Sequence, residues 1–202
     1  MSVATVYAGH SGVVPTWLEG RSLSDRVCLS GELAWDELRI VACDVLGALA
    51  HAHEGGLLHG ALHPDHVFLA EADGVIARAI VRGFGAALEP RDADIGFREG
   101  AFVATERLAY GPTVSSDVYA AAGLLYFAAT GAAPYTAPRS FDAPRFGSAA
   151  RIPQPLLGVL VHALSLDPAQ RYRSADELRN AVLAALDAVT GVRAAAGMRS
   201  SS

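Results

Sequence analysis

The feature that most constrains the fold is an uncharged run of sixteen residues at positions 118–133. A helix needs roughly 20 apolar residues to cross a membrane, so this run is too short to span one. It belongs instead to a helix predicted over residues 117–130, which Gly131 ends, and we expect that helix to be buried. The rest of the chain must pack around it.

Helical periodicity, with apolar side chains at i, i+3 and i+4, marks other stretches of the chain. The predicted helices cover residues 34–53, 153–165 and 174–189. Strand-like residues 67–69 and 75–81 flank an Asp73-Gly74 turn and predict a small hairpin. These elements predict a mainly α fold.

The remaining segments show no clear period. Residues 85–113 and 132–152 mix Gly, Pro and charge and predict long irregular connections, and a loop of that length inside a compact domain is usually functional. Residues 1–15 are loosely strand-like, and residues 191–202 predict a flexible tail. We expect a single domain between them, over residues 16–190.

Composition excludes several functions. All sixteen basic side chains are arginine, so chemistry that needs lysine is excluded, including Schiff-base catalysis and the lysine of a P-loop. The net charge of −5 and the absence of a basic cluster argue against nucleic-acid binding. Cys28 and Cys43 are too few and too far apart for a disulfide framework. Without a signal-peptide pattern at the N-terminus, we expect free thiols in a cytoplasmic protein.

Six short motifs occur along the chain: TWLEGRSL (16–23), LLHGALHPDHVFL (57–69), GFG (83–85), ATE (104–106), SDVYAAAGLLYFAATG (116–131) and DPAQRYRSADEL (167–178). Their order resembles the C-terminal lobe of eukaryotic-type serine/threonine protein kinases. In turn they resemble the family's hinge strand, its catalytic loop with the following strand, its D-F-G and A-P-E positions, its central helix and the segment of its late arginine. The resemblance implies a kinase C-lobe fold, a helical bundle with a small hairpin. It leaves only residues 1–15 for the N-lobe, which we expect to be absent or vestigial.

The catalytic positions depart from the family's pattern. The loop keeps His59 but has Gly60 and Ala61 for the Arg-Asp pair. The family's lysine and metal-binding asparagine are replaced by His63 and His66. Gly83 stands where the D-F-G aspartate would hold the nucleotide's magnesium. The resemblance therefore implies a pseudokinase, with no catalytic residues, no phosphotransferase activity and no ATP or magnesium cofactor.

The scaffold positions of the family are retained. The resemblance implies that Glu106 and Arg171 form a buried ion pair and that Asp117 accepts backbone hydrogen bonds from the catalytic loop. It also implies that His59 is a structural loop histidine and that Phe84 packs beneath the loop. Architecture without chemistry is typical of a binding module.

Several residues have two interpretations. His59, His63 and His66, with Asp65 between them, resemble a metal site in composition, but we favour a structural His59 with exposed His63 and His66. His63 or Asp65 as a replacement general base is a weaker alternative.

Two other groups of side chains could contact partners. The charged residues Arg91, Asp92, Asp94 and Arg98 form either a docking surface or, as we favour, a solvated loop. Trp17 and Trp35 are candidate interface anchors, and Trp17, next to the upper face of the lobe, is the better one.

The predicted function is non-catalytic binding or scaffolding of a protein or peptide, through the apolar upper face or the activation-segment groove. Residues 1–15, a second copy of the chain or a partner protein would cover the upper face. The alternative is a repurposed enzyme or accessory subunit of a modifying enzyme, using the loop 59–66 on a substrate that a partner delivers. A third hypothesis has a separate chain supplying the N-lobe. Neither a nucleic-acid partner nor a membrane span is expected.

Overall fold

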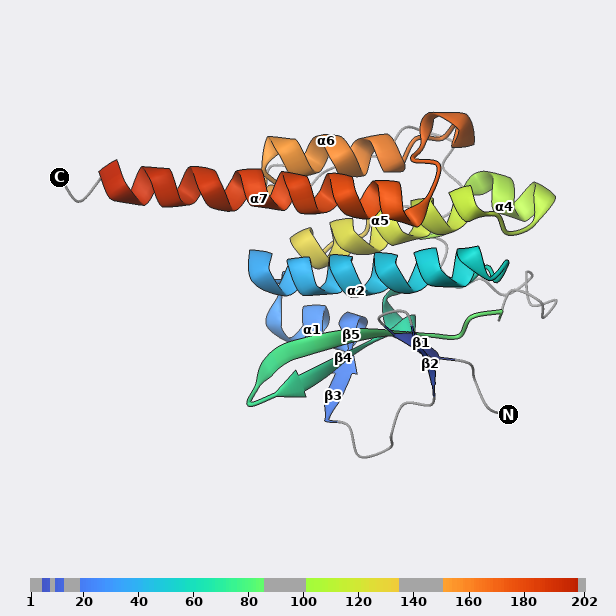
Figure 1. Cartoon of the computed structure of the whole chain (residues 1–202), viewed down its shortest axis with the longest axis horizontal. Coiled ribbons are helices and arrows are strands. Elements are labelled where there is room, and N and C mark those ends of the chain that lie inside the picture. Colours follow the sequence, from blue (N-terminus) through green and yellow to red (C-terminus); the bar gives the residue numbers. More distant parts are fainter. Residues whose placement is uncertain (1–4, 8–9, 13–18, 86–100, 135–150, 200–202) are drawn as a thin grey trace.

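A computed structural model describes residues 5–7, 10–12, 19–85, 101–134 and 151–199. Helices stack on one side of a small sheet (Figure 1). The helices are α1 (Leu23–Ser30), α2 (Trp35–Glu54), α4 (Thr105–Tyr110), α5 (Val114–Thr130), α6 (Gln154–Ala163) and α7 (Ala175–Arg199), with short 3-10 turns η1 (Pro64–His66) and η4 (Pro168–Gln170). The strands are β1 (Thr5–Tyr7), β2 (His10–Gly12), β3 (Gly20–Ser22), β4 (Val67–Ala72) and β5 (Val75–Arg82).

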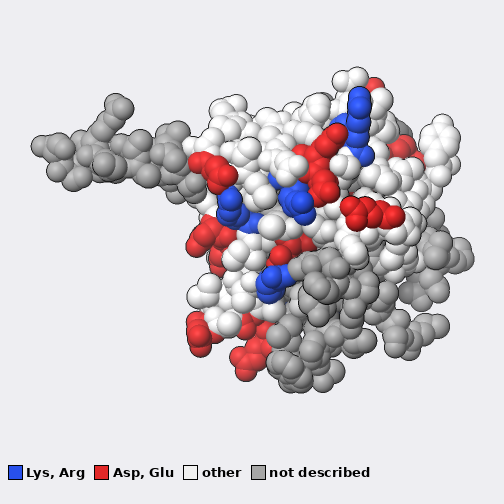
Figure 2. Space-filling model, viewed as in Figure 1, with Lys and Arg blue, Asp and Glu red and all other residues white. Residues whose placement is uncertain are grey.

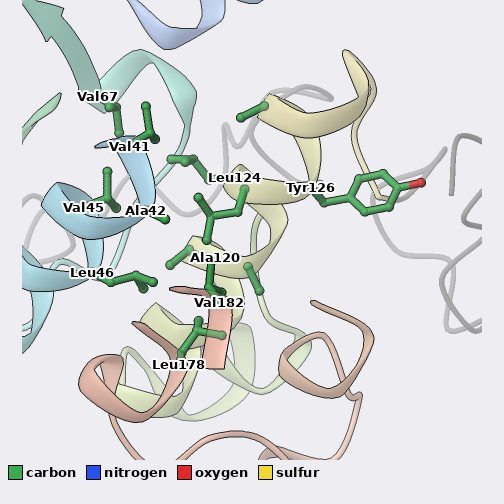
Figure 3. Close-up of a cluster of buried hydrophobic side chains, with 14 of the residues drawn as sticks. Val41, Ala42, Val45, Leu46, Val67, Ala120, Leu124, Tyr126, Leu178 and Val182 are labelled. Carbon is green, nitrogen blue, oxygen red and sulfur yellow. The ribbon is translucent and has the colours of Figure 1, made fainter. Parts of the chain in front are cut away.

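Helix α2 is the centre of the fold. It contacts β5 on one side and α5 and α7 on the other, so it lies between the sheet and helices α5, α6 and α7 (Figure 1). Its bounds agree with the predicted helix 34–53 to within one residue, because its buried residues repeat with the helical period. Figure 3 shows side chains of α2, α5 and α7 meeting in the core, with Val67 of β4 beside those of α2.

Helix α5 is the predicted buried helix, and side chains on all sides of it are buried. It begins at Val114, three residues before the predicted start, because Thr113 caps it. The Thr113 hydroxyl accepts from the Ser116 N–H at 3.1 Å, and the Ser116 hydroxyl accepts from the Thr113 N–H at 2.8 Å. Gly131 ends the helix in the left-handed conformation, as the sequence predicts.

The five strands form one antiparallel sheet in the order β2-β1-β5-β4-β3. The predicted hairpin is β4 and β5, and its turn places Asp73 and Gly74 at positive φ, which an Asp-Gly pair tolerates. Thr5 and Val6 pair with Arg82 and Val81, so β1 extends the sheet at the edge of β5. Part of the segment 1–15 therefore lies against the hairpin.

Three predicted boundaries differ from the structure. The region 85–113 is not irregular throughout, since its part beyond residue 100 contains α4. Helix α6 is shorter than the predicted 153–165. Helix α7 continues past residue 189 to Arg199, so most of the predicted tail 191–202 is helical. Alanine is a good helix former, so the alanines at 194–196 favour a continued helix although this segment has no apolar period.

On the face seen in Figure 2, arginine and carboxylate side chains are interspersed over the middle and upper part, and carboxylates gather at the lower left edge. Ion pairs on α2 and α7 include Arg39 with Asp187 and Arg179 with Asp176. Cys28 and Cys43 are both free thiols, as predicted, and both are exposed. In the described part of the chain, no helix combines the length and apolar character that a membrane crossing needs.

Candidate functional site: the loop at residues 59–66

Asp117 holds the start of the loop. It lies in the first turn of α5 and is 1% exposed. Its carboxylate accepts the backbone N–H groups of His59 at 2.9 Å and Gly60 at 2.8 Å. His53 of α2 adds a third hydrogen bond, from Nε2, at 2.9 Å. Because hydrogen bonds to an ionised acceptor are the strong ones, Asp117 fastens the loop to both α2 and α5.

His59 is fully buried, and both of its ring nitrogens bind backbone groups. Nε2 donates to the Arg82 carbonyl at 2.9 Å, and Nδ1 accepts from the Ala61 N–H at 3.3 Å. The ring centroid lies 4.9 Å from that of Phe84, which is also buried. Only the neutral ring can donate from one nitrogen and accept at the other, so His59 is a neutral structural residue.

His63 and His66 lie on top of this layer. The His66 ring is 4.0 Å from that of His63 and 5.3 Å from that of His59, measured between centroids. His66 Nδ1 donates to the Ala61 carbonyl at 2.8 Å. His63 is the N-cap of η1, and its Nδ1 accepts from the Asp65 N–H at 3.3 Å. The loop therefore brings three histidines into one stack, and His63 and His66 are only partly exposed.

Gly83 closes the site from below at the end of β5. Its φ of 84° lies in the left-handed region, where a side chain is strained. A Cβ placed there would lie 3.4 Å from Nε2 and Cδ2 of His66, so the imidazole fills the adjacent space. Arg82 precedes it, with its guanidinium over the Phe68 ring at 5.3 Å and donating to the Asp65 carbonyl at 3.2 Å.

A second anchor joins α4 to the helical body. Arg171, whose side chain is fully buried, donates from Nη1 and Nη2 to the two oxygens of Glu106, at 2.5 and 3.0 Å. Its remaining donors reach the carbonyls of Ser165 at 2.7 Å and Ser115 at 3.1 Å, and its guanidinium lies over the Tyr119 ring at 4.6 Å. This bidentate pair holds α4 against α5 and η4.

The same architecture occurs in known proteins. The kinase domain of PknI from Mycobacterium tuberculosis superposes with a TM-score of 0.64 at 28% identity, over 84% of this chain and 64% of that domain. Rad53 in complex with AMP-PNP gives a TM-score of 0.64 at 20% identity, over 82% of this chain and 45% of that one, which shows the fold alone. The chain has a protein-kinase-like fold. Its helices and hairpin correspond in size to the C-lobe.

Sequence comparison gives bacterial serine/threonine kinases as homologues. The chain is 25% identical over 183 residues to the serine/threonine-protein kinase PknA of Nostoc sp., covering 84% of this chain and 32% of that protein. It is 25% identical over 199 residues to the probable kinase PknB of Bifidobacterium longum, covering 91% of this chain and 29% of that protein. The chain thus spans less than a third of either relative. No protein-family model matches it.

Within this kinase-like fold, the predicted scaffold residues lie together. Asp117, His59 and Phe84 form one contact network around the loop, and Glu106 with Arg171 forms the other. Trp35 is half-buried at the start of α2. Part of its ring packs against the core, and only the remainder is open to solvent. Trp17 and the charged positions Arg91, Asp92, Asp94 and Arg98 lie outside the described residues.

The metal interpretation of the histidines has no geometric support. In the ranges that the structure describes, no three His, Cys, Asp or Glu side chains are grouped so as to hold a metal ion. His59 uses both nitrogens on backbone groups, and Nδ1 of His66 is bound to a carbonyl, so the three rings do not converge on a common point. The three rings stack on one another and do not form a ligand set.

His53 is a site residue that sequence reasoning did not identify. Its side chain is 8% exposed, Nε2 binds Asp117, and Nδ1 is buried without a hydrogen-bond partner. In the sequence it is one of several histidines near the end of a helix, and its contact is with a residue 64 positions away. Only its place on the face of α2 that turns to α5 could have suggested this role.

A separate cleft of about 450 Å³ lies between α2, β5 and α7. Cys43, Gly47 and His51 line it from α2, and the paired charges of Arg78 with Asp44 and Arg179 with Asp176 line its walls. Each arginine in it already faces a carboxylate, and Glu54 adds one further acidic side chain to the lining. None of its lining residues belongs to the loop 59–66.

His59 gives the protein a predicted acid sensitivity. Burial lowers its pKa from 6.5 to about 4, with Asp117 opposing the shift. His59 in the unfolded chain therefore binds its proton at higher pH than His59 in the folded chain. The contribution of neutral His59 to the free energy of unfolding is fully present above its pKa in the unfolded chain. It is lost as the pH falls toward its pKa in the folded chain. We expect a loss of about 3 kcal/mol by pH ~4 from this group. Urea unfolding at a series of pH values measures it.

The matched variants are His59→Asn and His51→Asn. Asn at position 59 cannot titrate. The slope of the unfolding free energy against pH, between pH ~6.5 and pH ~4, should therefore correspond to about one proton fewer taken up on unfolding. His51 is exposed on α2, and its replacement should leave the dependence as in the wild type. An unchanged slope in His59→Asn would contradict the assignment.

Proposed function

We propose that this chain is a catalytically inactive kinase-like module that binds a protein or peptide partner. The observation that carries the proposal is the set of residues around the loop, where Ala61, His66 and Gly83 stand at the three positions at which the family places its catalytic and metal-binding side chains. None of the three carries a carboxylate. The scaffold that positions them is nevertheless complete in Asp117 and the Glu106–Arg171 pair.

The residues present do not fit a nucleotide-bound magnesium ion. Magnesium requires hard oxygen ligands, and the loop offers an imidazole and a glycine in their place. The two oxygens of Asp117 already accept hydrogen bonds from the loop backbone and His53. Asp65 is 61% exposed and is bound through its backbone to Arg82 and His63. The ligand atoms available around the loop therefore support the proposal that the chain does not transfer phosphate.

Two exposed areas support partner binding. The loop presents Asp65 to solvent with His63 and His66 beside it. Helix α4 buries none of its residues, and Leu108 and Tyr110 are 53% and 87% exposed. A short helix that is held by an ion pair and presents large apolar side chains is a typical surface for a protein or peptide. A second copy of the chain is one such partner.

Mg·ATP should leave the melting temperature of the full chain unchanged. A ligand at a hundred times its Kd stabilises a protein by about 2.7 kcal/mol, which would raise Tm by roughly 5–10 °C for a chain of this size. We therefore expect a shift within error in a thermal melt, and no transfer of labelled phosphate to the chain or to a generic substrate. An active protein kinase domain, measured in parallel, should show the rise in Tm and so serves as the positive control for Mg·ATP binding.

The outcomes separate the hypotheses. A clear nucleotide-dependent rise in Tm would contradict the proposal, and phosphate transfer would contradict it directly. Once a partner is known, replacing His63 and His66 together by Ala separates binding from repurposed catalysis. If the double variant still binds the partner but no longer modifies the delivered substrate, the loop 59–66 is the active site of a repurposed enzyme. If only binding is weakened, the result supports a binding module. Light scattering reports whether the partner is a second copy.

A further inference from the structure

His63 makes a hydrogen bond that depends on its protonation state. Its Nδ1 accepts the Asp65 N–H at the start of η1, and a ring nitrogen can accept only while it carries no proton. The carboxylate of Asp65 lies 3.7 Å from the same Nδ1. A proton added at Nδ1 would turn this acceptor into a donor, so it could no longer bind the Asp65 N–H. It could then donate to the Asp65 carboxylate.

The neighbours of His63 make the two states differ further. The His66 ring is 4.0 Å away and the buried, neutral His59 ring lies beyond it, so added charge in this stack meets other imidazoles. The charged groups on adjacent elements are Arg82 of β5, bound to the Asp65 carbonyl, and Asp117 of α5, bound to the loop backbone and to His53 of α2. The Asp65 carboxylate is within ion-pair distance of His63 Nδ1.

We propose that the loop 59–66 is a proton-sensitive element, in which His63 exchanges its hydrogen bond from the Asp65 backbone for an ion pair with the Asp65 carboxylate on acidification. The neutral ring caps η1, and the charged ring releases the Asp65 N–H and turns to the carboxylate. Histidine is the side chain that ordinarily titrates between about pH 5 and pH 8, so an experiment across that range tests the exchange. His59 stays neutral there, because burial lowers its pKa to about 4.

This switch deepens the proposed function, since the loop belongs to the surface that we assign to partner binding. In the neutral state η1 is capped and Asp65 presents a fixed carboxylate to solvent. In the acidic state the carboxylate is taken up by His63, so a partner that recognises Asp65 would be released. The test of the switch uses the free chain, so its outcome is independent of whether a partner or a nucleotide binds.

Amide hydrogen exchange of the full chain tests the switch. The protection factor, which corrects the exchange rate for the intrinsic effect of pH, should fall for the Asp65 amide by about 2- to 10-fold between pH ~7.5 and pH ~5, the range expected for one hydrogen bond. The midpoint should coincide with the titration of the His63 ring followed by NMR. A pH-independent protection factor, or a midpoint unrelated to the ring, would overturn the proposal.

Two variants isolate His63. His63→Asn keeps an oxygen acceptor for the Asp65 N–H but cannot titrate, so its protection should stay at the neutral value across the range. His162→Asn changes a histidine on α6, remote from the loop in sequence, whose ring packs on Tyr172, and should keep the wild-type response. An equal fall of protection in His63→Asn and wild type would assign the effect to another group. The wild-type titration alone remains decisive if the Asn variant does not fold.

Discussion

Replacement of Arg171 by alanine is expected to lower the free energy of unfolding by about 3–5 kcal/mol, because it leaves the Glu106 carboxylate without its partner. The Arg171 side chain is fully buried and that of Glu106 is 14% exposed, so water replaces the lost hydrogen bonds only in part. The change also removes donors to two carbonyls and the contact with the Tyr119 ring. Urea unfolding at neutral pH measures the effect.

Arg151→Ala is the matched control for the Arg171 variant. Arg151 also pairs with a glutamate, Glu32, but the two side chains are 61% and 50% exposed and 3.4 Å apart. An exposed pair contributes about 0–1 kcal/mol, so this variant should unfold close to the wild type. If Arg171→Ala changed stability by less than about 0.5 kcal/mol, the buried ion pair would not be a support of the fold.

The second large effect is expected at Asp117. Asp117→Ala removes the acceptor for the N–H groups of His59 and Gly60, both in the buried start of the loop. Each unsatisfied buried donor costs about 1–3 kcal/mol, so we expect a loss of roughly 3 kcal/mol or more. The same variant should expose the two amides to hydrogen exchange, which distinguishes a local opening of the loop from a general loss of stability.

Asp117→Asn and Asp187→Ala complete this experiment. The amide at position 117 keeps one oxygen acceptor but loses the charge, so it should destabilise the protein less than alanine does. Asp187 pairs with Arg39 on the surface and is 64% exposed, and its replacement should change stability by less than about 1 kcal/mol. A similar small effect at Asp117 would mean that the loop does not depend on its carboxylate.

Local signals in the sequence predicted much of the fold. The period of apolar residues located α2, and the Asp73-Gly74 pair located the hairpin turn, because both effects act within a few residues. Helix starts and ends were predicted less accurately than helix positions. The cap by Thr113 moved the start of α5, and α4 lies in a region without a periodic pattern, since it buries none of its own residues.

The candidate site was predicted in part. The resemblance implied that Asp117 accepts backbone hydrogen bonds from the loop and that Phe84 packs beneath it, and the structure contains both contacts. It did not identify His53, whose hydrogen bond to Asp117 joins residues 64 positions apart. Nor could the sequence show that Nδ1 of His63 accepts from the Asp65 backbone, because the direction of a side chain in a loop depends on the rings that pack beside it.

The sequence by itself determined which chemical groups stand at each position. Lysine is absent, and no carboxylate or amide is available at positions 61, 66 and 83, whatever the fold. Only the tertiary structure decided which groups meet. It paired Glu106 with Arg171 across 65 positions, filled the space beside Gly83 with the His66 ring and joined β1 to β5. Such contacts depend on how distant segments pack around α2 and α5, and short-range preferences carry no information about that packing.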